Sequence, residues 1–551
     1  MSAGSRAYRL EETLIGPGAL DPPPTRHALF VFVIAFAALL HLTTIGSGDI
    51  QNRSEGMYAG GAREMLADGN FFLPTSDGQS QLQTPPLCHW LIIGSYRVFG
   101  VNEAAARLPF ALAIVLTSAL VFLIAERLGN FWQGFLAALI YSTLAGNFLL
   151  ARMAMPEGIF TASITAALYF ALRGYQDRNS RPRCALAFWI SIALATMAEH
   201  LLALLYPAAI VISASFLFRE ARLRFRAFLN LRSVLIFAAL VLPWHIWLAL
   251  HFPDYLHELF WNTSPQIFRL QSLGLAVGCL FPWLLLATPA LLFTARRVIR
   301  FSEFDFAESL PFIWIGVGLM MLFTGPFRGG AAMAAWPAIA ILVARTWERS
   351  SAPMRSAGVI LIVAIGMTLA LCSCGILSSV WPALKPGLWA SAASLILFGL
   401  AAIVLIRVQR SELAAISIAA AMVPVGLAIV DGIAQMSPYL SLAHAARFTN
   451  PGSANGAELI FEGSLDAGSS LLFYFPRKFF LAHPSPQRSR ESNELYLDEA
   501  AVMAKWRSAK CVYMIVEQNR VAYWQRLLTD EFHIYHQVTT CGTHAVLSNQ
   551  L

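Results

Sequence analysis

Residues 108–125 read LPFALAIVLTSALVFLIA, a run of eighteen residues with no charged side chain. A helix of this length, rising about 1.5 Å per residue, covers most of the roughly 30 Å hydrocarbon core of a bilayer. Similar runs recur along the 551 residues, of which 57% are hydrophobic and only 13% are charged, with a mean hydropathy of +0.59. The sequence therefore predicts a polytopic helical membrane protein rather than several soluble domains.

About thirteen apolar runs are long enough to span a membrane. They begin near Ala28, Arg107, Trp132, Ile159, Ala185, Leu201, Ser233, Ser272, Leu310, Ala331, Ala357, Leu388 and Leu413. Arginine clusters follow alternate runs, as at residues 173–183, 219–232 and 296–300. If the N-terminus is cytoplasmic, alternation through the spans puts every cluster on the cytoplasmic side. The basic residues thus behave as membrane-flanking charges, and we expect no nucleic-acid partner.

Two segments should then lie outside. The first is a long loop, about residues 43–106, within a membrane domain of residues 1–436. The second is a tail of residues 437–551, which we expect to be a small α/β domain. Its expected strands are Ser470–Phe475, Cys511–Val516 and His544–Leu547, and its expected helices are Tyr496–Arg507 and Val521–Leu528. In an oxidising compartment Cys511 and Cys541 either form a disulfide or remain two free strand cysteines.

The first outer loop contains a segment with helical periodicity. Apolar residues recur at the spacing of one helix face between Met57 and Leu66, which predicts a helix lying in the membrane interface from about Ser54. Ser54 can cap this helix, and Glu55 lies in its first turn, where the helix dipole favours a carboxylate. Glu55 is therefore either a first-turn helix charge or a site residue.

The same loop carries an ordered series of motifs. They are Glu-x-x-Tyr at 55–58, Ala-Arg-Glu-Met-Leu at 62–66, Gly-Asn-Phe-Phe-Leu-Pro at 69–74, Thr-Pro-Pro-Leu-x-x-Trp-Leu at 84–91 and Phe-Gly-Val-Asn-Glu-x-Ala-Ala-Arg-Leu-Pro at 99–109. This series resembles the C-type membrane glycosyltransferases of the protein-mannosyltransferase and lipid A aminoarabinose-transferase type. The resemblance implies a mainly helical fold of about thirteen spans, with interfacial helices in the first outer loop and a small outer C-terminal α/β domain.

The resemblance also implies a function. We expect an enzyme that transfers a sugar from a polyprenyl phosphate carrier, undecaprenyl phosphate in bacteria, to a lipid, glycan or protein acceptor. We expect it in a bacterial inner membrane, with the N-terminus cytoplasmic and the C-terminal domain periplasmic. A lipid or polysaccharide transporter would instead place polar residues deep in adjacent spans, which are nearly free of them here. A non-catalytic family member that senses or scaffolds remains an alternative.

Transfer to a hydroxyl needs a carboxylate, and a departing phosphate needs cations. By the resemblance, Glu55 is the first candidate base, Asp49 is a substitute, and Glu157 is the second carboxylate. The family's usual Asp and Lys are replaced by Ser54 and Thr84. Arginines must then hold the phosphate or the acceptor, because no lysine precedes Lys385.

The remaining candidates follow from the same carry-over. The residues expected to bind phosphate or acceptor are Arg53, Tyr58, Arg63, Arg107, Arg152, Arg269 and Arg328, and those expected elsewhere in the pocket are Thr84, Pro85 and His89. Any single arginine is equally well explained as an interfacial side chain that reaches toward water. The histidines show no recognisable metal spacing, so a divalent metal is not indicated and we expect no certain cofactor.

Overall fold

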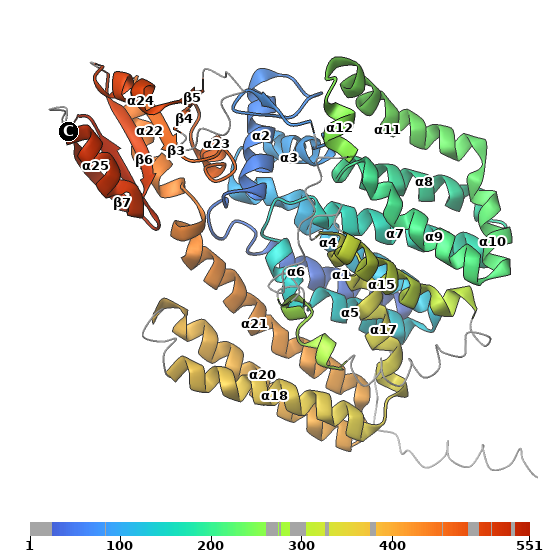
Figure 1. The fold of residues 1–551 in the computed structure, drawn as a ribbon. Coiled ribbons are helices and arrows are strands. Elements are labelled where there is room, and N and C mark those ends of the chain that lie inside the picture. Colours follow the sequence, from blue (N-terminus) through green and yellow to red (C-terminus); the bar gives the residue numbers. More distant parts are fainter. Residues whose placement is uncertain are drawn as a thin grey trace, which may run out of the picture.

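The computed structural model describes residues 25–82, 84–260, 274, 277–286, 305–324, 330–374, 382–454, 456–482, 495–508, 510–529 and 535–550. It has two parts, a helical membrane domain and a smaller α/β domain at the C-terminal end (Figure 1). The apolar run expected from Ser272 lies partly outside the described residues, and the candidates Arg269 and Arg328 lie wholly outside them.

The membrane domain is built from helices that follow the apolar runs of the sequence. Their bounds are α1 (Arg26–Leu42), α4 (Glu103–Leu128), α5 (Phe131–Ser142), α6 (Ala145–Leu150), α7 (Glu157–Gln176), α8 (Arg181–Ala198), η1 (Leu201–Leu204), α9 (Leu205–Leu217), α10 (Arg219–Phe225), η2 (Arg226–Leu229), α11 (Leu231–His251), α12 (Tyr255–Phe260), α15 (Phe306–Thr324), α16 (Gly330–Met333), α17 (Trp336–Arg349), α18 (Ala352–Cys374), η4 (Pro382–Leu384), α20 (Lys385–Arg407) and α21 (Ser411–Leu440).

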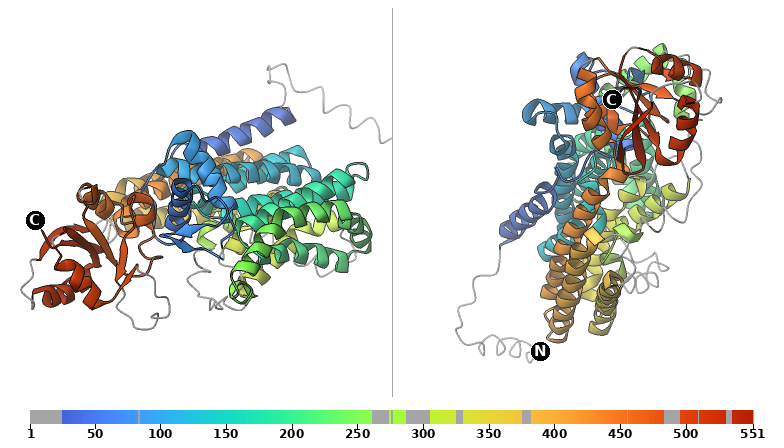
Figure 2. Two further views of the ribbon diagram at one scale, coloured as in Figure 1. Left: turned by 90° about the horizontal axis from the view of Figure 1, so that it is seen from above. Right: turned by 90° about the vertical axis from the view of Figure 1, so that its left-hand side faces the viewer.

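Five helices in the described part of the chain are long and apolar enough to cross a membrane: α4, α11, α18, α20 with its preceding turn, and α21. Shorter apolar helices include α1, α5 and α9. α4 occupies the centre of the bundle, where it packs on α1, α5 and α7, and two-thirds of its apolar window is buried. The helices α18, α20 and α21 form a second group beside this bundle (Figures 1 and 2). A polytopic helical fold is thereby confirmed.

The segment expected to be the first outer loop, a name that we keep for it, folds into short elements at one end of the membrane helices. They are α2 (Ser54–Asp68), the hairpin strands β1 (Thr75–Ser76) and β2 (Gln79–Ser80), and α3 (Leu87–Phe99). α2 begins at the expected residue, but Arg53 occupies the N-cap position and no side chain caps the helix. α3 begins immediately after Pro86, where a proline can precede a helix without losing a hydrogen bond.

The C-terminal domain is a six-stranded sheet with helices on both faces. After α22 (Ala443–Ala454) come β3 (Glu458–Glu462), α23 (Ser470–Tyr474), β4 (Phe480–Ala482), β5 (Tyr496–Leu497), α24 (Glu499–Trp506), β6 (Val512–Glu517), η6 (Gln518–Arg520), α25 (Val521–Thr529), β7 (His536–Cys541) and β8 (His544–Ser548). The strand order is β5-β4-β3-β6-β8-β7. The first four strands are parallel to one another, and β8 is antiparallel to both of its neighbours, β6 and β7.

Alternation along β3 explains the two layers. Leu459 and Phe461 pack with α22 and α23, whereas Ile460 packs with α24 and α25 on the other face. The first layer lies toward the membrane domain and the second faces away from it (Figures 1 and 2).

The structure corrects two expectations for the tail and decides one open alternative. Tyr496–Leu497 form β5, so the helix expected from Tyr496 begins at Glu499 as α24. Residues 470–474 form α23 rather than a strand, because this short apolar segment packs against both the sheet and α2, so its periodicity carries no signal. All the cysteines are free, including Cys511 and Cys541. Cys511 precedes the start of β6 and Cys541 ends β7, at opposite ends of the sheet, as the register shows. A disulfide between them is excluded by this distance along the strands.

Candidate functional site

The chain between α1 and α2 is a turn organised by one buried arginine of α4. The Arg107 guanidinium donates from Nη1 to the carbonyl oxygens of Ile45 (3.2 Å), Ser47 (2.9 Å) and Gly48 (3.0 Å). Its Nη2 donates to the carbonyl oxygen of Asp49 at 2.9 Å. We call residues 45–55 the Arg107 turn. These bonds use the donors of Arg107 within the protein, which leaves it unsuited to bind a substrate phosphate.

Glu55 closes the same turn through an ion pair with Arg107. The two side chains are fully buried, and Arg107 Nε lies 2.7 Å from Glu55 Oε1. Glu55 also accepts from Arg107 Nη2 (3.4 Å) and from the backbone N–H groups of Gln51 (2.9 Å) and Ala154 (3.2 Å). The bond to Ala154 joins the first outer loop to the second. Because Glu55 accepts four hydrogen bonds, its carboxylate is held in one orientation.

The second outer loop, between α6 and α7, carries the next two candidates. Arg152 is buried and donates to the carbonyl oxygen of Leu40 (2.7 Å) and to Thr44 Oγ1. Burial and the nearby positive charge of Arg107 lower the pKa of Arg152 to about 10. Glu157 is the first residue of α7 and only 8% exposed. Arg152 thus lies near Arg107 and ties the loop to the end of α1.

α3 brings the first outer loop against Glu157. Burial, followed by the carboxylates of Glu199 and Glu157, raises the pKa of the Cys88 thiol. Cys88 Sγ also lies 3.6 Å from the carbonyl oxygen of Ala198, at the end of α8. Cys88, in the N-terminal turn of α3, is therefore within electrostatic range of Glu157 at the start of α7 and of Glu199 at the end of α8.

His89 and Tyr58, both candidates, pack together on the neighbouring side. Their ring centroids are 5.1 Å apart. His89 is 2% exposed, and burial lowers its pKa to about 3, so it is neutral near pH 7. Pro85 is also buried, while Thr84 is half-buried with its N–H 3.4 Å from the carbonyl oxygen of Gln81. These residues support the interface between α2 and α3.

The fourth outer element approaches the loop from α11. Trp244 Nε1 donates to the carbonyl oxygen of Phe72 at 3.0 Å, and His245 Nδ1 lies 2.5 Å from the hydroxyl of Tyr255. His245 is 6% exposed, and the structure brings His200 close to it. Four separate outer segments are therefore brought together at one end of the bundle.

A second carboxylate pair lies at the other end of α2, where the β1–β2 hairpin folds over it. Glu64 accepts from Thr75 Oγ1 (2.9 Å) and from the N–H groups of Asp77 (2.7 Å) and Gly78 (2.8 Å). Asp77 is 5% exposed. Burial and the charge of Glu64 raise the pKa of Asp77 to about 7, against the lowering effect of Lys478. Asp77 therefore changes charge near physiological pH.

The C-terminal domain covers the remaining side of the loop. Arg447 Nη2 lies 2.7 Å from Asp49 Oδ1 and 3.5 Å from Glu103 Oε1. The Tyr474 hydroxyl donates to Glu103 Oε1 (2.9 Å) and accepts from the N–H of Ile50 (2.8 Å). Asp49, a candidate base, is thus paired at the domain boundary.

The other arginine candidates differ in what they bind. Arg63 is half-buried and donates to the carbonyl oxygen of Phe473, whereas the side chain of Arg53 is exposed and makes no ion pair with any described residue. Arg269 and Arg328 lie outside the described residues. Of the four candidate arginines that the structure describes, Arg53 is the one with an exposed side chain and no ion pair to a described residue, so its guanidinium can bind a ligand. The described part of the chain contains no group of three or more side chains that could hold a metal.

Sequence reasoning missed several members of this arrangement. Glu64, Asp77, Glu199 and His245 entered no candidate site. Asp77-Gly78 is a recognisable hairpin turn, and the positive φ of both residues agrees with it. The burial of Asp77 beside Glu64, however, depends on tertiary packing and leaves no local signal.

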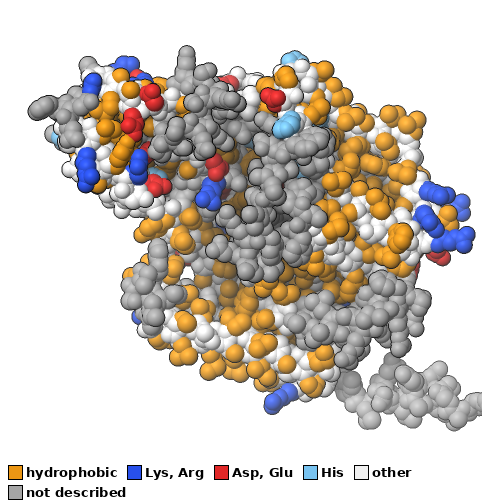
Figure 3. All heavy atoms as spheres, in the orientation of Figure 1, with side chains coloured by type: hydrophobic (Ala, Val, Ile, Leu, Met, Phe, Trp, Pro, Cys, Tyr) orange, Lys and Arg blue, Asp and Glu red, His pale blue; other side chains and the backbone are white. Residues whose placement is uncertain are grey.

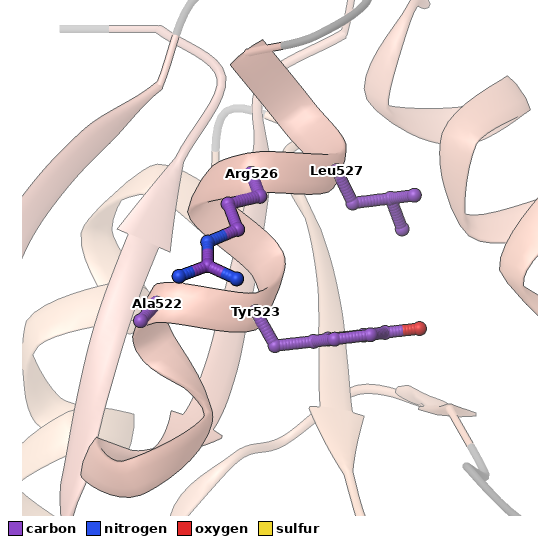
Figure 4. Close-up of a pocket in the computed structure, with 4 residues that line it drawn as sticks. All are labelled: Ala522, Tyr523, Arg526 and Leu527. Carbon is purple, nitrogen blue, oxygen red and sulfur yellow. The ribbon is translucent and has the colours of Figure 1, made fainter.

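A shallow hollow on the outer face of the C-terminal domain is separate from this arrangement. It is lined by Ala522, Tyr523, Arg526 and Leu527 of α25. Tyr523 and Leu527 project to one side of the helix, whereas Arg526 runs back along it (Figure 4). The Tyr523 hydroxyl bonds to Glu499, and the Arg520 guanidinium lies 4.1 Å from the centre of the Tyr523 ring. The hollow is on the layer that faces away from α2.

The family model "Dolichyl-phosphate-mannose-protein mannosyltransferase" matches residues 83–247. The structure superposes on "ArnT from Cupriavidus metallidurans bound to Undecaprenyl phosphate" with a TM-score of 0.79, 18% identity and coverage of 94% of this chain and 97% of that chain. The resemblance to the C-type membrane glycosyltransferases is confirmed.

Two curated relatives match part of the chain. The chain is 26% identical over 280 residues to the undecaprenyl phosphate-alpha-4-amino-4-deoxy-L-arabinose arabinosyl transferase of Shewanella sediminis, covering 48% of this chain and 50% of that protein. It is 29% identical over 170 residues to an uncharacterised protein of Aquifex aeolicus, covering 31% of this chain and 33% of that protein. The chain therefore spans a third to a half of the length of these relatives, and the solved structure establishes the fold.

Proposed function

We propose that this chain is a glycosyltransferase that moves a sugar from a polyprenyl phosphate carrier to a lipid, glycan or protein acceptor. The observation that carries the proposal is the hydrogen bond from the Ala154 N–H to Glu55, 3.2 Å long. It joins the first and second outer loops, so that carboxylates and guanidinium groups from separate segments gather at one end of the membrane bundle. The names of the similar proteins support a donor carried on undecaprenyl phosphate.

The chemistry assigns different tasks to the gathered groups. In the transfer, the bond between the anomeric carbon and the carrier phosphate oxygen breaks, and a bond from the same carbon to the acceptor oxygen forms. A hydroxyl acceptor gives its proton to a carboxylate, and the carrier leaves as polyprenyl phosphate. Glu157 is the stronger candidate for that carboxylate because Glu55 already accepts four hydrogen bonds. Asp49 is the third candidate for this carboxylate, because it lies in the Arg107 turn close to Glu55.

The proposed orientation places this chemistry on the outer side of a bacterial inner membrane. Basic side chains gather around α10, at the end of the molecule opposite the C-terminal domain (Figures 1 and 3). Cytoplasmic loops carry such an excess of arginine. Where the side chains between the two ends are coloured by type, most of the surface in this view is apolar (Figure 3). These features support a cytoplasmic N-terminus and a periplasmic C-terminal domain at residues 437–551.

A transfer assay tests the proposal. Purified protein is incubated with undecaprenyl-phosphate sugars that carry a radiolabel, and the labelled product shows which sugar moves and onto what. We expect transfer by the unchanged protein and a loss of about 10²-fold to 10⁴-fold in E157Q, because a general base contributes about that much.

The matched control is E220Q on α10, at the other end of the bundle, where Glu220 forms an exposed pair with Arg224. We expect E220Q to keep full activity. Absence of transfer from every undecaprenyl-linked sugar would contradict the proposed function, and full activity of E157Q would remove Glu157 from its role.

A further inference from the structure

Arg53, the residue before α2, has a backbone conformation that is unusual for an L-amino acid. Its φ is 70° and its ψ is −130°. Glycine adopts this region readily, but a side chain there costs on the order of 1–3 kcal/mol and persists only where the surroundings impose it. Such residues concentrate at functional sites. Glu55 follows two positions later, so the conformation of Arg53 decides how the Arg107 turn enters α2.

The contacts that impose this conformation come from the C-terminal part of the chain. The Arg53 N–H donates to the carbonyl oxygen of Asp466 at 2.9 Å, and Ser469 Oγ donates to the carbonyl oxygen of Arg53 at 2.9 Å. Asn52 is held in the same way. Its N–H donates to the carbonyl oxygen of Leu440 (2.8 Å), and its Oδ1 accepts from the N–H of Ser470 (3.1 Å). The polar groups of two consecutive residues thus bond to α21 and to the β3–α23 segment.

Close packing fixes the same boundary. A Cβ on Gly56 would lie 2.6 Å from Ser469 Oγ and from the backbone of Ser470, and a Cβ on Gly60 would lie 2.3 Å from Leu472 Cβ. Only glycine at these two positions, one helical turn apart, lets α2 approach the α23 segment so closely. Figures 1 and 2 show α23 beside α2. The Arg107 turn is therefore held by α4 on one side and by the C-terminal domain on the other.

We propose that the C-terminal domain positions the substrate-facing end of this turn, and that Ser469 is the positioning residue that sets Arg53 to bind a phosphoryl group. The inference rests on the proposed function, because it assigns the ligand of the same site. The Arg53 guanidinium is exposed, and it has no ion-pair partner in the described chain. A guanidinium binds phosphate through two parallel hydrogen bonds, so its orientation matters more than that of a lysine ammonium.

Binding of undecaprenyl phosphate in detergent micelles to S469A and R53A tests the ligand. Loss of one intramolecular hydrogen bond corresponds to roughly three- to tenfold in affinity. We expect S469A and R53A each to weaken binding by about that factor, and the double variant to bind no more weakly than R53A. Ser464 lies in the same segment, and its hydroxyl accepts from the Ala467 N–H. It makes no hydrogen bond to the first loop among the described residues, so S464A is the control and should bind normally.

Several outcomes would overturn the proposal. One is unchanged affinity in S469A, and another is additive loss in the double variant. Inorganic phosphate could also displace undecaprenyl phosphate at concentrations similar to that of the lipid. This result would show that the site recognises free phosphate, and would overturn the lipid-phosphate assignment. In the transfer assay, S469A should raise the KM for the donor and leave kcat within about twofold, a split that general destabilisation would not give.

The backbone is measured separately, so that failure of the proposed function can be recognised. Peptides covering residues 50–57 should exchange amide hydrogen faster in S469A than in the unchanged protein or in S464A. R53G should melt at a higher temperature than R53A, because both lack the guanidinium and only R53G relieves the backbone. If the unchanged protein binds no undecaprenyl phosphate, the proposed function fails, and equal exchange together with equal melting would also refute the positioning role.

Discussion

A carboxylate is buried near each end of α2, but the two carboxylates have opposite neighbours: one lies beside a cation and the other beside a second carboxylate. At the N-terminal end, Glu55 accepts four hydrogen bonds, two of them from Arg107. At the C-terminal end, Asp77 is buried beside a second carboxylate, Glu64, and its pKa is raised to about 7. The Glu55 carboxylate is paired with Arg107 and fixes a turn, whereas the charge of Asp77 changes with pH. Burial alone therefore does not identify the reactive carboxylate; its partners do.

The largest expected effect comes from removing the cation at the N-terminal end. R107A leaves Glu55 buried without its partner and breaks four hydrogen bonds to backbone carbonyl oxygens of the Arg107 turn. Removing one member of a buried pair costs about 3–5 kcal/mol. We expect a large fall in melting temperature in detergent. The control is R26A, since Arg26 pairs with Glu126 on the surface and exposed pairs contribute about 0–1 kcal/mol. An equal fall in melting temperature in R107A and R26A would show that the buried pair contributes no more than the surface pair, and would contradict this prediction.

The next effect concerns the side of α2 that packs on the C-terminal domain. G60A places a methyl group 2.3 Å from Leu472 Cβ, so the two segments must separate. Overpacking of this kind costs about 1–3 kcal/mol. We expect a lower melting temperature and faster proteolysis between the domains. Gly94 of α3 offers the matched control, because a Cβ there meets nothing within 4 Å. G94A should be neutral or slightly stabilising.

The third prediction uses the titration of Asp77 at the other end of α2. The native pKa is raised above the value of about 3.9 in an unfolded chain, so the native state binds the proton more tightly. Stability is then fully present below about pH 4 and falls as the pH rises through about 7. D77N should remove this fall and melt higher than the unchanged protein at pH 8, with little difference at pH 5.

The groups that face Asp77 set the size of this pH effect. Glu64 raises its pKa and Lys478 lowers it. K478A should therefore enlarge the difference between the two pH values. A melting temperature that falls equally with pH in D77N and in the unchanged protein would show that another group titrates.

The smallest expected effect concerns the cysteines of the C-terminal domain. Cys511 and Cys541 end opposite sides of the sheet and are free. C511A should change the free energy of unfolding by about 0.5 kcal/mol or less, with or without a reducing agent. A reductant-dependent melting temperature that disappears in C511A would contradict the register of β6, β8 and β7.

Much of the fold could be predicted because apolar runs and helical periodicity are visible in short stretches of the sequence. Apolar runs located the membrane helices, and the periodicity after Met57 located α2. The segment 470–475 was assigned to a strand because a five-residue apolar helix between two surfaces has no distinguishing period. The sequence leaves the pairing of Cys511 and Cys541 open, since pairing depends on strand register rather than on spacing.

In the candidate site too, short motifs identify some residues, whereas the partners of those residues depend on contacts between distant segments. The resemblance selected Glu55 and Glu157 from motifs, but the partner of Glu55 is 52 residues away in α4. Arg107 was a phosphate candidate because nothing local shows that its donors are already used by the Arg107 turn. Arg53 is one of six candidate arginines in the sequence, and its backbone and its contact with Ser469 separate it from the others. Long-range hydrogen bonds, rather than residue type, distinguish these arginines.

The most direct test is a structure of the purified protein in a lipid environment with undecaprenyl phosphate bound. The account predicts that the lipid phosphate lies within hydrogen-bond reach of the Arg53 guanidinium and that the Glu157 carboxylate opens into the same cavity. A phosphate bound at another face of the molecule, with Glu157 directed away from it, would contradict the account.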